Sequence, residues 1–248
     1  MDSTSLDLDA APTRRAVWAL AWPAAVSVVL NNAFRVVDQY SVQDLGSSAQ
    51  AAIGSCTFIL IFFFAVYEVM AAGVGPLIAR ATGAGDRRMQ AHVLGQGLMG
   101  GVLLGVLVCM SCGLGADWLS RAIGLSGESG QMSEVYLRHL GYAGLPLAIS
   151  PIMDAAFIAM GRIRLVMGLH AVSTLLNLAL NYLLIYELEM GIAGAAWASG
   201  ISRVVVLVPG VVVLVRLLSP EISDFRLGKE VLRVQRVGLP IALNTAAY

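Results

Sequence analysis

Four polar side chains lie inside strongly apolar stretches and are the first candidates for chemistry. Asp38 is near the end of the apolar run 16–41, and Ser199 lies in the last long apolar run. Asn177 and Asn181 are four residues apart, so they share one face of a helix. At a helical rise of about 1.5 Å per residue, all four reach a similar depth in the outer half of their segments. Oxygen atoms at one level can surround a small hard cation or hold a proton with water.

We therefore predict a cation- or proton-coupling site at Asp38, Asn177, Asn181 and Ser199. The oxygen atoms of Asp38, Asn177 and Asn181 are candidate ligands for Na+. The alternative is that the two amides and the hydroxyl only hydrogen-bond between helices, which contributes about 0.6 kcal/mol each. The acid favours the coupling site, because a charge inside a bilayer is seldom kept without a partner or a role.

Four further charged residues in the apolar runs are candidates for a modulator or for a substrate cavity. Arg35 is one turn before Asp38 and either pairs with it or points to the external interface. Glu68, Asp154 and Arg203 lie nearer the middle or the inner half of their segments. Arg203 with either acid would form a compensated buried pair; alternatively, the acids attract a cationic substrate.

Other reactive side chains give no sign of catalysis. Cys109 and Cys112 form a C-x-x-C inside an apolar run and are expected to pack between helices. His139 and His170 lie near segment ends and are expected at the membrane interface. We find no nucleophile with a base and an orienting group, and no phosphate-binding glycine loop. We therefore expect no enzyme, no catalytic residue, no cofactor beyond the coupling ion and no structural metal.

The composition is that of a polytopic membrane protein. The chain is 58% hydrophobic and 13% charged, with a mean hydropathy of +0.77, whereas soluble domains carry about 25% charged residues. The opening segment has three Asp residues and no basic start, so we expect no cleavable signal. The expected partners are membrane lipid and a small-molecule substrate, with no nucleic acid.

Apolar runs long enough to cross a bilayer predict an all-α transmembrane fold. Six helices are expected near 16–41, 50–79, 91–116, 134–160, 165–187 and 190–217. The predicted parts are a tail (1–15), a six-helix lobe (16–218), a linker (219–236) and the start of a seventh helix (237–248). Gly97, Gly101 and Gly105 recur every fourth residue and predict a face open to close helix packing.

Most basic residues fall in one set of alternating loops, which predicts a multi-pass protein of the plasma (inner) membrane with a cytoplasmic N-terminus. The opening of the first run also recurs near the end of the chain. Val237–Asn244 matches Leu20–Ser27 at a proline with apolar residues on both sides, after a basic lead-in. A repeat with an even number of helices restarts in parallel orientation, so we interpret the chain as the first half of a duplicated transporter.

In order and spacing, several short motifs together resemble the multidrug and toxic compound extrusion (MATE) family. They are Leu20–Pro23, Val37–Asp38, Leu45–Gly46, Ala51–Gly54, Ala79–Asp86, Met160–Arg162, Leu176–Asn177, Asn181–Ile185 and Gly191–Ser199. The resemblance runs from about residue 16 to the end of the sequence. It implies the N-terminal half of an antiporter with two six-helix lobes.

Such an antiporter exchanges inward-moving H+ or Na+ for outward-moving organic compounds, often cationic. The resemblance makes Asp38 the coupling acid and makes Asn177, Asn181 and Ser199 the rest of its cation site. The missing C-terminal lobe, or a second copy of the chain, is then needed to complete the substrate chamber. Two alternatives stay open: a lipid-linked oligosaccharide flippase of the related superfamily, expected to carry more basic residues in its cavity, and a non-transporting membrane fragment.

Overall fold

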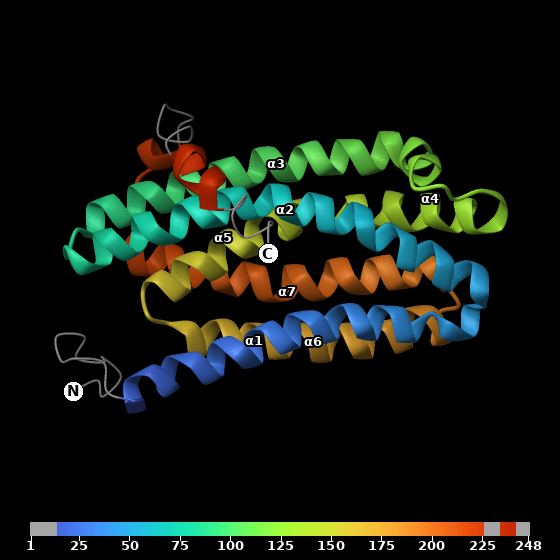
Figure 1. Cartoon of the computed structure of the whole chain (residues 1–248), viewed down its shortest axis with the longest axis horizontal. Helices are drawn as coiled ribbons and strands as arrows, with labels where there is room; N and C mark the ends of the chain where they lie inside the picture. Colours follow the sequence, from blue (N-terminus) through green and yellow to red (C-terminus); the bar gives the residue numbers. More distant parts are fainter. Residues whose placement is uncertain (1–13, 226–233, 242–248) are drawn as a thin grey trace.

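The computed structural model describes residues 14–225 and 234–241, which are almost entirely helical and contain no strand (Figure 1). The elements in chain order are α1 (Arg14–Ser41), η1 (Gln43–Leu45), α2 (Ser47–Gly83), α3 (Arg87–Ala122), α4 (Gly127–Gly141), α5 (Gly144–Ala159), α6 (Ile163–Asn181), η2 (Tyr182–Glu187), α7 (Gly191–Leu218) and η3 (Ile222–Phe225). Five segments are long and apolar enough to cross a membrane, and α4 with α5 makes a sixth if the bent pair counts as one span. The predicted all-α transmembrane class is confirmed.

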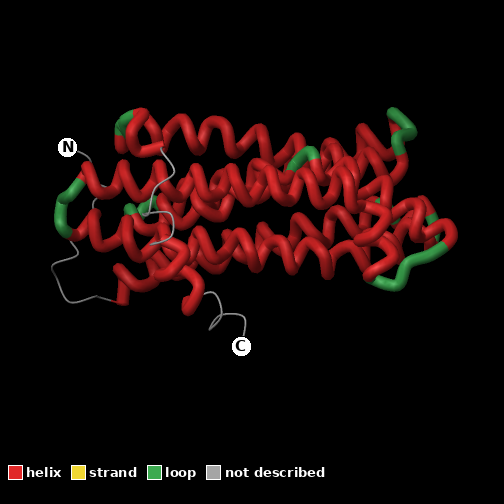
Figure 2. The backbone as a smooth tube through the Cα atoms, turned by 90° about the horizontal axis from the view of Figure 1, so that it is seen from above, coloured by secondary structure: helices red, strands yellow, loops and turns green. Residues whose placement is uncertain are grey.

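The long helices run alternately up and down a single bundle. The start of α1, the α2–α3 turn, the α5–α6 connection and the end of α7 lie at one end, on the left of Figure 1. The connections α1–α2, α3–α4 and α6–α7 lie at the other end. Figure 2, a view from above, shows that most loops gather at the two ends of the bundle. The loops that carry most basic residues are therefore at one end of the molecule.

The predicted fourth helix, 134–160, is wrong in one respect: it is two helices. The chain bends by 58° between α4 and α5. A Cβ atom added at Gly144 would lie 2.9 Å from the carbonyl oxygen of Gly105, so α3 and α5 touch there through their backbones. Pro146 is tolerated in the first turn of α5, because the N–H group that proline lacks would have no intrahelical acceptor there. Hydropathy runs unbroken across the bend, and this is why the apolar pattern missed it.

The predicted glycine face of α3 does pack closely against its neighbours. A Cβ atom at Gly101 would lie 2.6 Å from Ile152 Cδ1, and one at Gly105 would lie 2.8 Å from Leu145 Cα. The α3 axis can therefore approach α5 more closely than larger residues would allow. Cys109 and Cys112, both free, pack beside this contact. A Cβ atom at Gly144 of α5 would lie 2.9 Å from Cys109 Sγ, and one at Gly141 of α4 would lie 2.9 Å from Cys112 Cβ.

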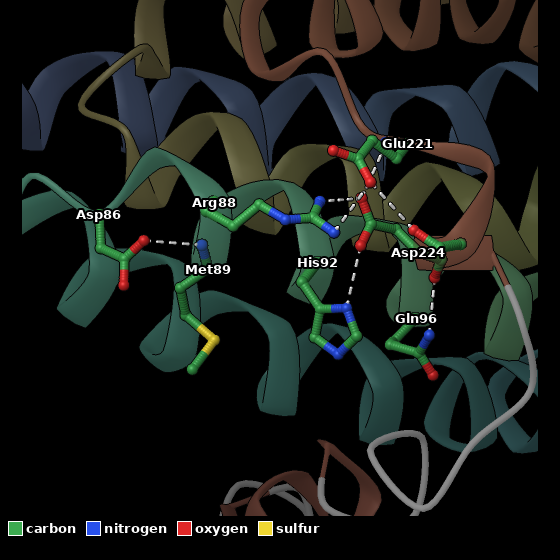
Figure 3. A network of polar contacts seen from close by, with 8 residues as sticks. Asp86, Arg88, Met89, His92, Gln96, Glu221 and Asp224 are labelled. Atoms are coloured by element: carbon green, nitrogen blue, oxygen red, sulfur yellow. Dashed lines mark hydrogen bonds and ion pairs between the residues drawn. The ribbon is translucent and has the colours of Figure 1, made fainter.

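Near the turn between α2 and α3, both helices are longer than predicted: α2 ends at Gly83 and α3 begins at Arg87, whereas the apolar pattern predicted 79 and 91. Gly85 has φ +67°, a left-handed conformation that glycine tolerates best. Asp86 then caps α3, because its carboxylate accepts a hydrogen bond of 2.9 Å from the Met89 backbone N–H (Figure 3). The helices continue past the apolar limit because local turn and cap residues, and not hydropathy, end them.

A buried acid fastens the short helix η3 to α3 (Figure 3). The Asp224 carboxylate accepts a 2.6 Å hydrogen bond from Arg88 Nη1 and lies 3.0 Å from His92 Nδ1. Its backbone carbonyl accepts a further 2.6 Å bond from Gln96 Nε2. Asp224 is fully buried. We call this contact the η3 clamp.

Part of each predicted terminal segment lies outside the described residues: 1–13 of the tail, 226–233 of the linker and 242–248 of the last helix. Residues 234–241 are helical. A Cβ atom at Gly73 of α2 would meet the Val234 carbonyl oxygen, and one at Gly238 would meet the Val69 carbonyl oxygen of α2. Residues 234–241 therefore lie directly against α2.

Candidate functional site

Asp38, near the C-terminal end of α1, is buried and accepts three hydrogen bonds from side chains of α6 and α7. Asn177 Nδ2 and Asn181 Nδ2 each donate to Asp38 Oδ1 over 2.9 Å. Ser199 Oγ donates to Asp38 Oδ2 over 2.6 Å. The side chains singled out from the sequence thus form one cluster, which we call the Asp38 cluster.

The helices explain why these four residues meet. The helix α1 packs along α6, and α6 packs along α7. Asn177 and Asn181 are fully buried on one face of α6, and Asn181 Nδ2 also donates to Asn177 Oδ1 over 3.3 Å. Asn181 is the last α-helical residue before the π-helical turn η2. Its Oδ1 atom is buried and has no hydrogen-bond partner, so the cluster retains one unused acceptor.

Arg35 does not pair with Asp38, although it is one turn away. Its guanidinium lies over the Phe64 ring, 5.7 Å from the ring centroid. Within the described residues Asp38 makes no ion pair, and its donors are neutral amides and a hydroxyl. Arg35 is exposed and lines the cavity beside α2. The predicted pairing with Asp38 is therefore wrong, and an external interfacial position for Arg35 stays a prediction.

Arg203 forms no ion pair with Glu68 or Asp154, and the predicted compensated pair is wrong. Its Nη2 atom donates to Asn31 Oδ1 over 3.0 Å, and the guanidinium lies 4.4 Å from the centroid of the Phe34 ring. Both contacts come from α1. A neutral amide and an aromatic face on the facing helix contact the guanidinium in place of a carboxylate. Its Nε atom is buried and has no hydrogen-bond partner within the described residues.

His170 is not an interfacial side chain, and this is the residue that the sequence pattern missed. His170 Nε2 lies 2.9 Å from Asp154 Oδ2, and the two side chains are 14% and 18% exposed. The other ring nitrogen lies 3.3 Å from the Ser27 carbonyl oxygen of α1. One signal was available: His170 precedes Asn177 by seven residues, or two helical turns, which places both on one face of α6.

A cavity of about 760 Å³ opens between these helices. Its wall is mostly apolar and aromatic. The charged residues that line it are Arg35, Asp38, Glu68, Asp154 and Arg203. All four residues predicted as a modulator or a substrate cavity therefore face one space, together with Asp38. Among the described residues no three His, Cys, Asp or Glu side chains are grouped to hold a metal ion.

Comparison with known families and structures agrees with this arrangement. A family model described as MatE matches residues 23–183, which is more than half of the chain. The chain belongs to the MatE family. A probable multidrug resistance protein NorM of Halalkalibacterium halodurans is 28% identical over 208 residues, covering 79% of this chain and 44% of the relative. The multidrug export protein MepA of Staphylococcus saprophyticus is 24% identical over 226 residues, covering 89% of this chain and 50% of the relative.

Solved structures of MATE transporters also match this chain, over about half of their own length. A crystal structure of MATE in the bent conformation superposes with a TM-score of 0.85 at 25% identity, covering 94% of this chain and 53% of that one. A MOP superfamily transporter from Pyrococcus furiosus, described as having a binding pocket of reverse polarity, superposes with a TM-score of 0.81 at 25% identity, covering 90% of this chain and 51% of that one. The chain therefore spans about half the length of the relatives it matches, and corresponds to the N-terminal half of the family fold. It is a multi-pass membrane protein.

Proposed function

We propose that the chain is the N-terminal lobe of a secondary active exporter in which the Asp38 cluster binds H+ or Na+ and the neighbouring cavity binds organic, often cationic, compounds. One observation carries the proposal: a buried carboxylate, held only by neutral donors from two other helices, borders a large cavity. A second lobe, either the C-terminal lobe typical of the family or another copy of this chain, completes the chamber.

Binding of either ion would rearrange the hydrogen bonds that join α1 to α6 and α7. A protonated Asp38 has its own O–H donor, so one donor now facing it must turn into an acceptor. The Ser199 hydroxyl can do this because it both donates and accepts. A sodium ion needs oxygen ligands, and the unused Asn181 Oδ1 supplies one if the amide turns toward Asp38. In both cases ion binding changes contacts between helices, which is what coupling to a conformational change requires.

The cavity wall suits amphipathic cations. Phe34, Phe63, Phe64 and Tyr67 offer aromatic faces to which a positive charge can be attracted. Glu68 and Asp154 add negative charge. The two arginines of the cavity lie over the rings of Phe64 and Phe34, so part of their charge is already directed at aromatic faces.

The flippase alternative would place a phosphate-bearing lipid in this cavity. Such a ligand is expected to need more basic residues than Arg35 and Arg203, and three carboxylates share the same wall. The cavity charge therefore favours export of cationic compounds. We also place the N-terminus in the cytoplasm, because the loops with most basic residues gather at the end of the bundle where α1 starts.

The test is ethidium efflux from cells under imposed H+ and Na+ gradients, with the chain expressed alone and joined to a second lobe. We expect efflux to follow one of the two gradients and to be lost in Asp38→Asn. The matched control is Asp117→Asn, which changes an acid paired with Arg121 on the surface of α3. Efflux that survives in Asp38→Asn would sink the coupling assignment. Flipping of a lipid-linked oligosaccharide without ethidium efflux would favour the flippase.

A further inference from the structure

The contact between Asp154 and His170 contains more acceptors than a neutral imidazole can satisfy. One ring nitrogen faces a carboxylate oxygen at 2.9 Å, and the other faces the Ser27 carbonyl oxygen at 3.3 Å. A neutral imidazole has a single N–H. Both contacts are hydrogen bonds only if one extra proton is present, on the ring or on the carboxyl group. Without that proton, two lone pairs face each other at one of the two contacts.

The pair is distinct from the Asp38 cluster. None of the hydrogen-bond partners of Asp38 is shared with Asp154 or His170. Along α6, His170 lies two turns, or about 10 Å, from Asn177. The pair joins α6 to α5 and, through Ser27, to α1, whereas the Asp38 cluster joins α1 to α6 and α7.

One member of the pair, Asp154, faces the central cavity. Asp154 lines the cavity, and its Oδ1 atom has no hydrogen-bond partner. The charged groups that share the wall are Arg35 and Asp38 on α1, Glu68 on α2 and Arg203 on α7. A change of one charge on the pair therefore changes the charge that the cavity presents to a ligand.

We propose that Asp154 and His170 form a second proton-binding site, on the cavity wall, at which a proton and a cationic compound exclude each other. With the proton bound, the pair has no net charge. When the proton leaves, the pair carries one negative charge, and Asp154 Oδ1 can face the cation. The proton goes to water in the cavity. The mutual exclusion rests on the proposed function, since it needs a cationic ligand, whereas the proton site does not.

The first measurement follows binding of tetraphenylphosphonium, a permanent cation, to the full 248-residue chain in lipid nanodiscs at pH 6 and pH 8. We expect affinity to fall about tenfold at pH 6, the effect of one unit charge close to the ligand in a hydrated cavity. The change should be less than twofold in His170→Gln. His139→Gln, which alters a histidine bonded to the Val135 carbonyl and outside the cavity wall, should behave as wild type. A tenfold change that persists in His170→Gln would overturn the proposal.

The second measurement does not depend on a substrate. The sequence contains three histidines, so 15N spectra of labelled histidine can be assigned by removing His139 and His92 in turn. We expect the His170 signals to change between pH 5 and pH 8, and Asp154→Asn to move that transition. If wild type binds no tetraphenylphosphonium but this titration is seen, the cationic-substrate proposal fails and the proton site stands. His170 signals that stay constant over this range would overturn the proton site itself.

Discussion

The Ser199 hydroxyl donates to Asp38 Oδ2 over 2.6 Å, and this bond ties α7 to α1 across the end of α6. Both residues are buried, at 5% and 7% exposure. The link between these helices therefore depends on a hydrogen bond to a carboxylate away from bulk water.

Ser199→Ala should destabilise the lobe by about 1–3 kcal/mol, the usual penalty for removing a buried donor to a charged group. The measurement is thermal unfolding in detergent. Ser111→Ala is the matched control, because Ser111 donates only to a carbonyl of its own helix on an exposed face. Equal melting temperatures for the two variants would contradict this role of Ser199.

Asn181→Asp should make the stability of the lobe depend more strongly on Na+. Two carboxylates in hydrogen-bond contact repel each other unless a proton or a cation lies between them. A bound ion stabilises the folded state by mass action, so the melting temperature should rise more with added NaCl than in wild type, with choline chloride as the salt control. Asn32→Asp changes an amide that donates to Val28 O on α1 and should show no added Na+ effect.

The glycine face of α3 predicts a graded series. Gly105→Ala should destabilise by about 1–3 kcal/mol, because the new methyl group meets the Leu145 backbone at 2.8 Å. Gly101→Ala meets only the end of the Ile152 side chain and should have a smaller effect. Gly113→Ala has open space and should stabilise by roughly 0.5–1 kcal/mol. Unfolding by heat or denaturant ranks the three variants, and any other order would refute the packing.

The η3 clamp predicts a loss of stability at acid pH. Burial raises the pKa of Asp224, but hydrogen bonds from Arg88, His92 and the Glu221 backbone outweigh it, so the pKa lies below its ordinary value. A folded-state pKa below the unfolded one gives stability that is present at neutral pH and is lost as the pH falls from about 4 downward.

Asp224→Asn should therefore lower the melting temperature at pH 7, and the difference from wild type should shrink toward pH 3. Glu221→Gln is the control, since its side chain is 68% exposed and its 3.3 Å ion pair with Arg88 is expected to contribute little to stability. A difference that is the same at both pH values would show that the charge of Asp224 does not matter.

The orientation of the bundle can be tested by labelling. With the three native cysteines replaced, Ser126→Cys before α4 should react in intact cells with a maleimide that does not cross membranes. Ala84→Cys in the α2–α3 turn should react only after the cells are opened. The reverse pattern would place the N-terminus outside.

The Asp38 cluster could be predicted from the sequence because helical periodicity and rise fix which face a residue occupies and how deep it lies. For Asn177 and Asn181, the spacing of four residues was enough to place both side chains on one face of α6. The partners of Arg203 and His170 could not be predicted in this way, because they depend on how α1, α5 and α7 are rotated about their own axes. The bend before Gly144 was missed for a related reason: it is set by contact with α3, and the apolar pattern of one segment carries no information about its neighbour.

The η3 clamp also has a mechanical consequence. Asp224 lies six residues beyond the last residue of α7, Leu218, yet its bonds go to α3. A pull that reaches Phe225 is therefore received by α3 before α7, and the glycine face of α3 lies directly against α5. Such a force would act on the α3–α5 contact before it acts on α7. It would therefore reach α5, which carries Asp154, before it reaches α7, which carries Ser199.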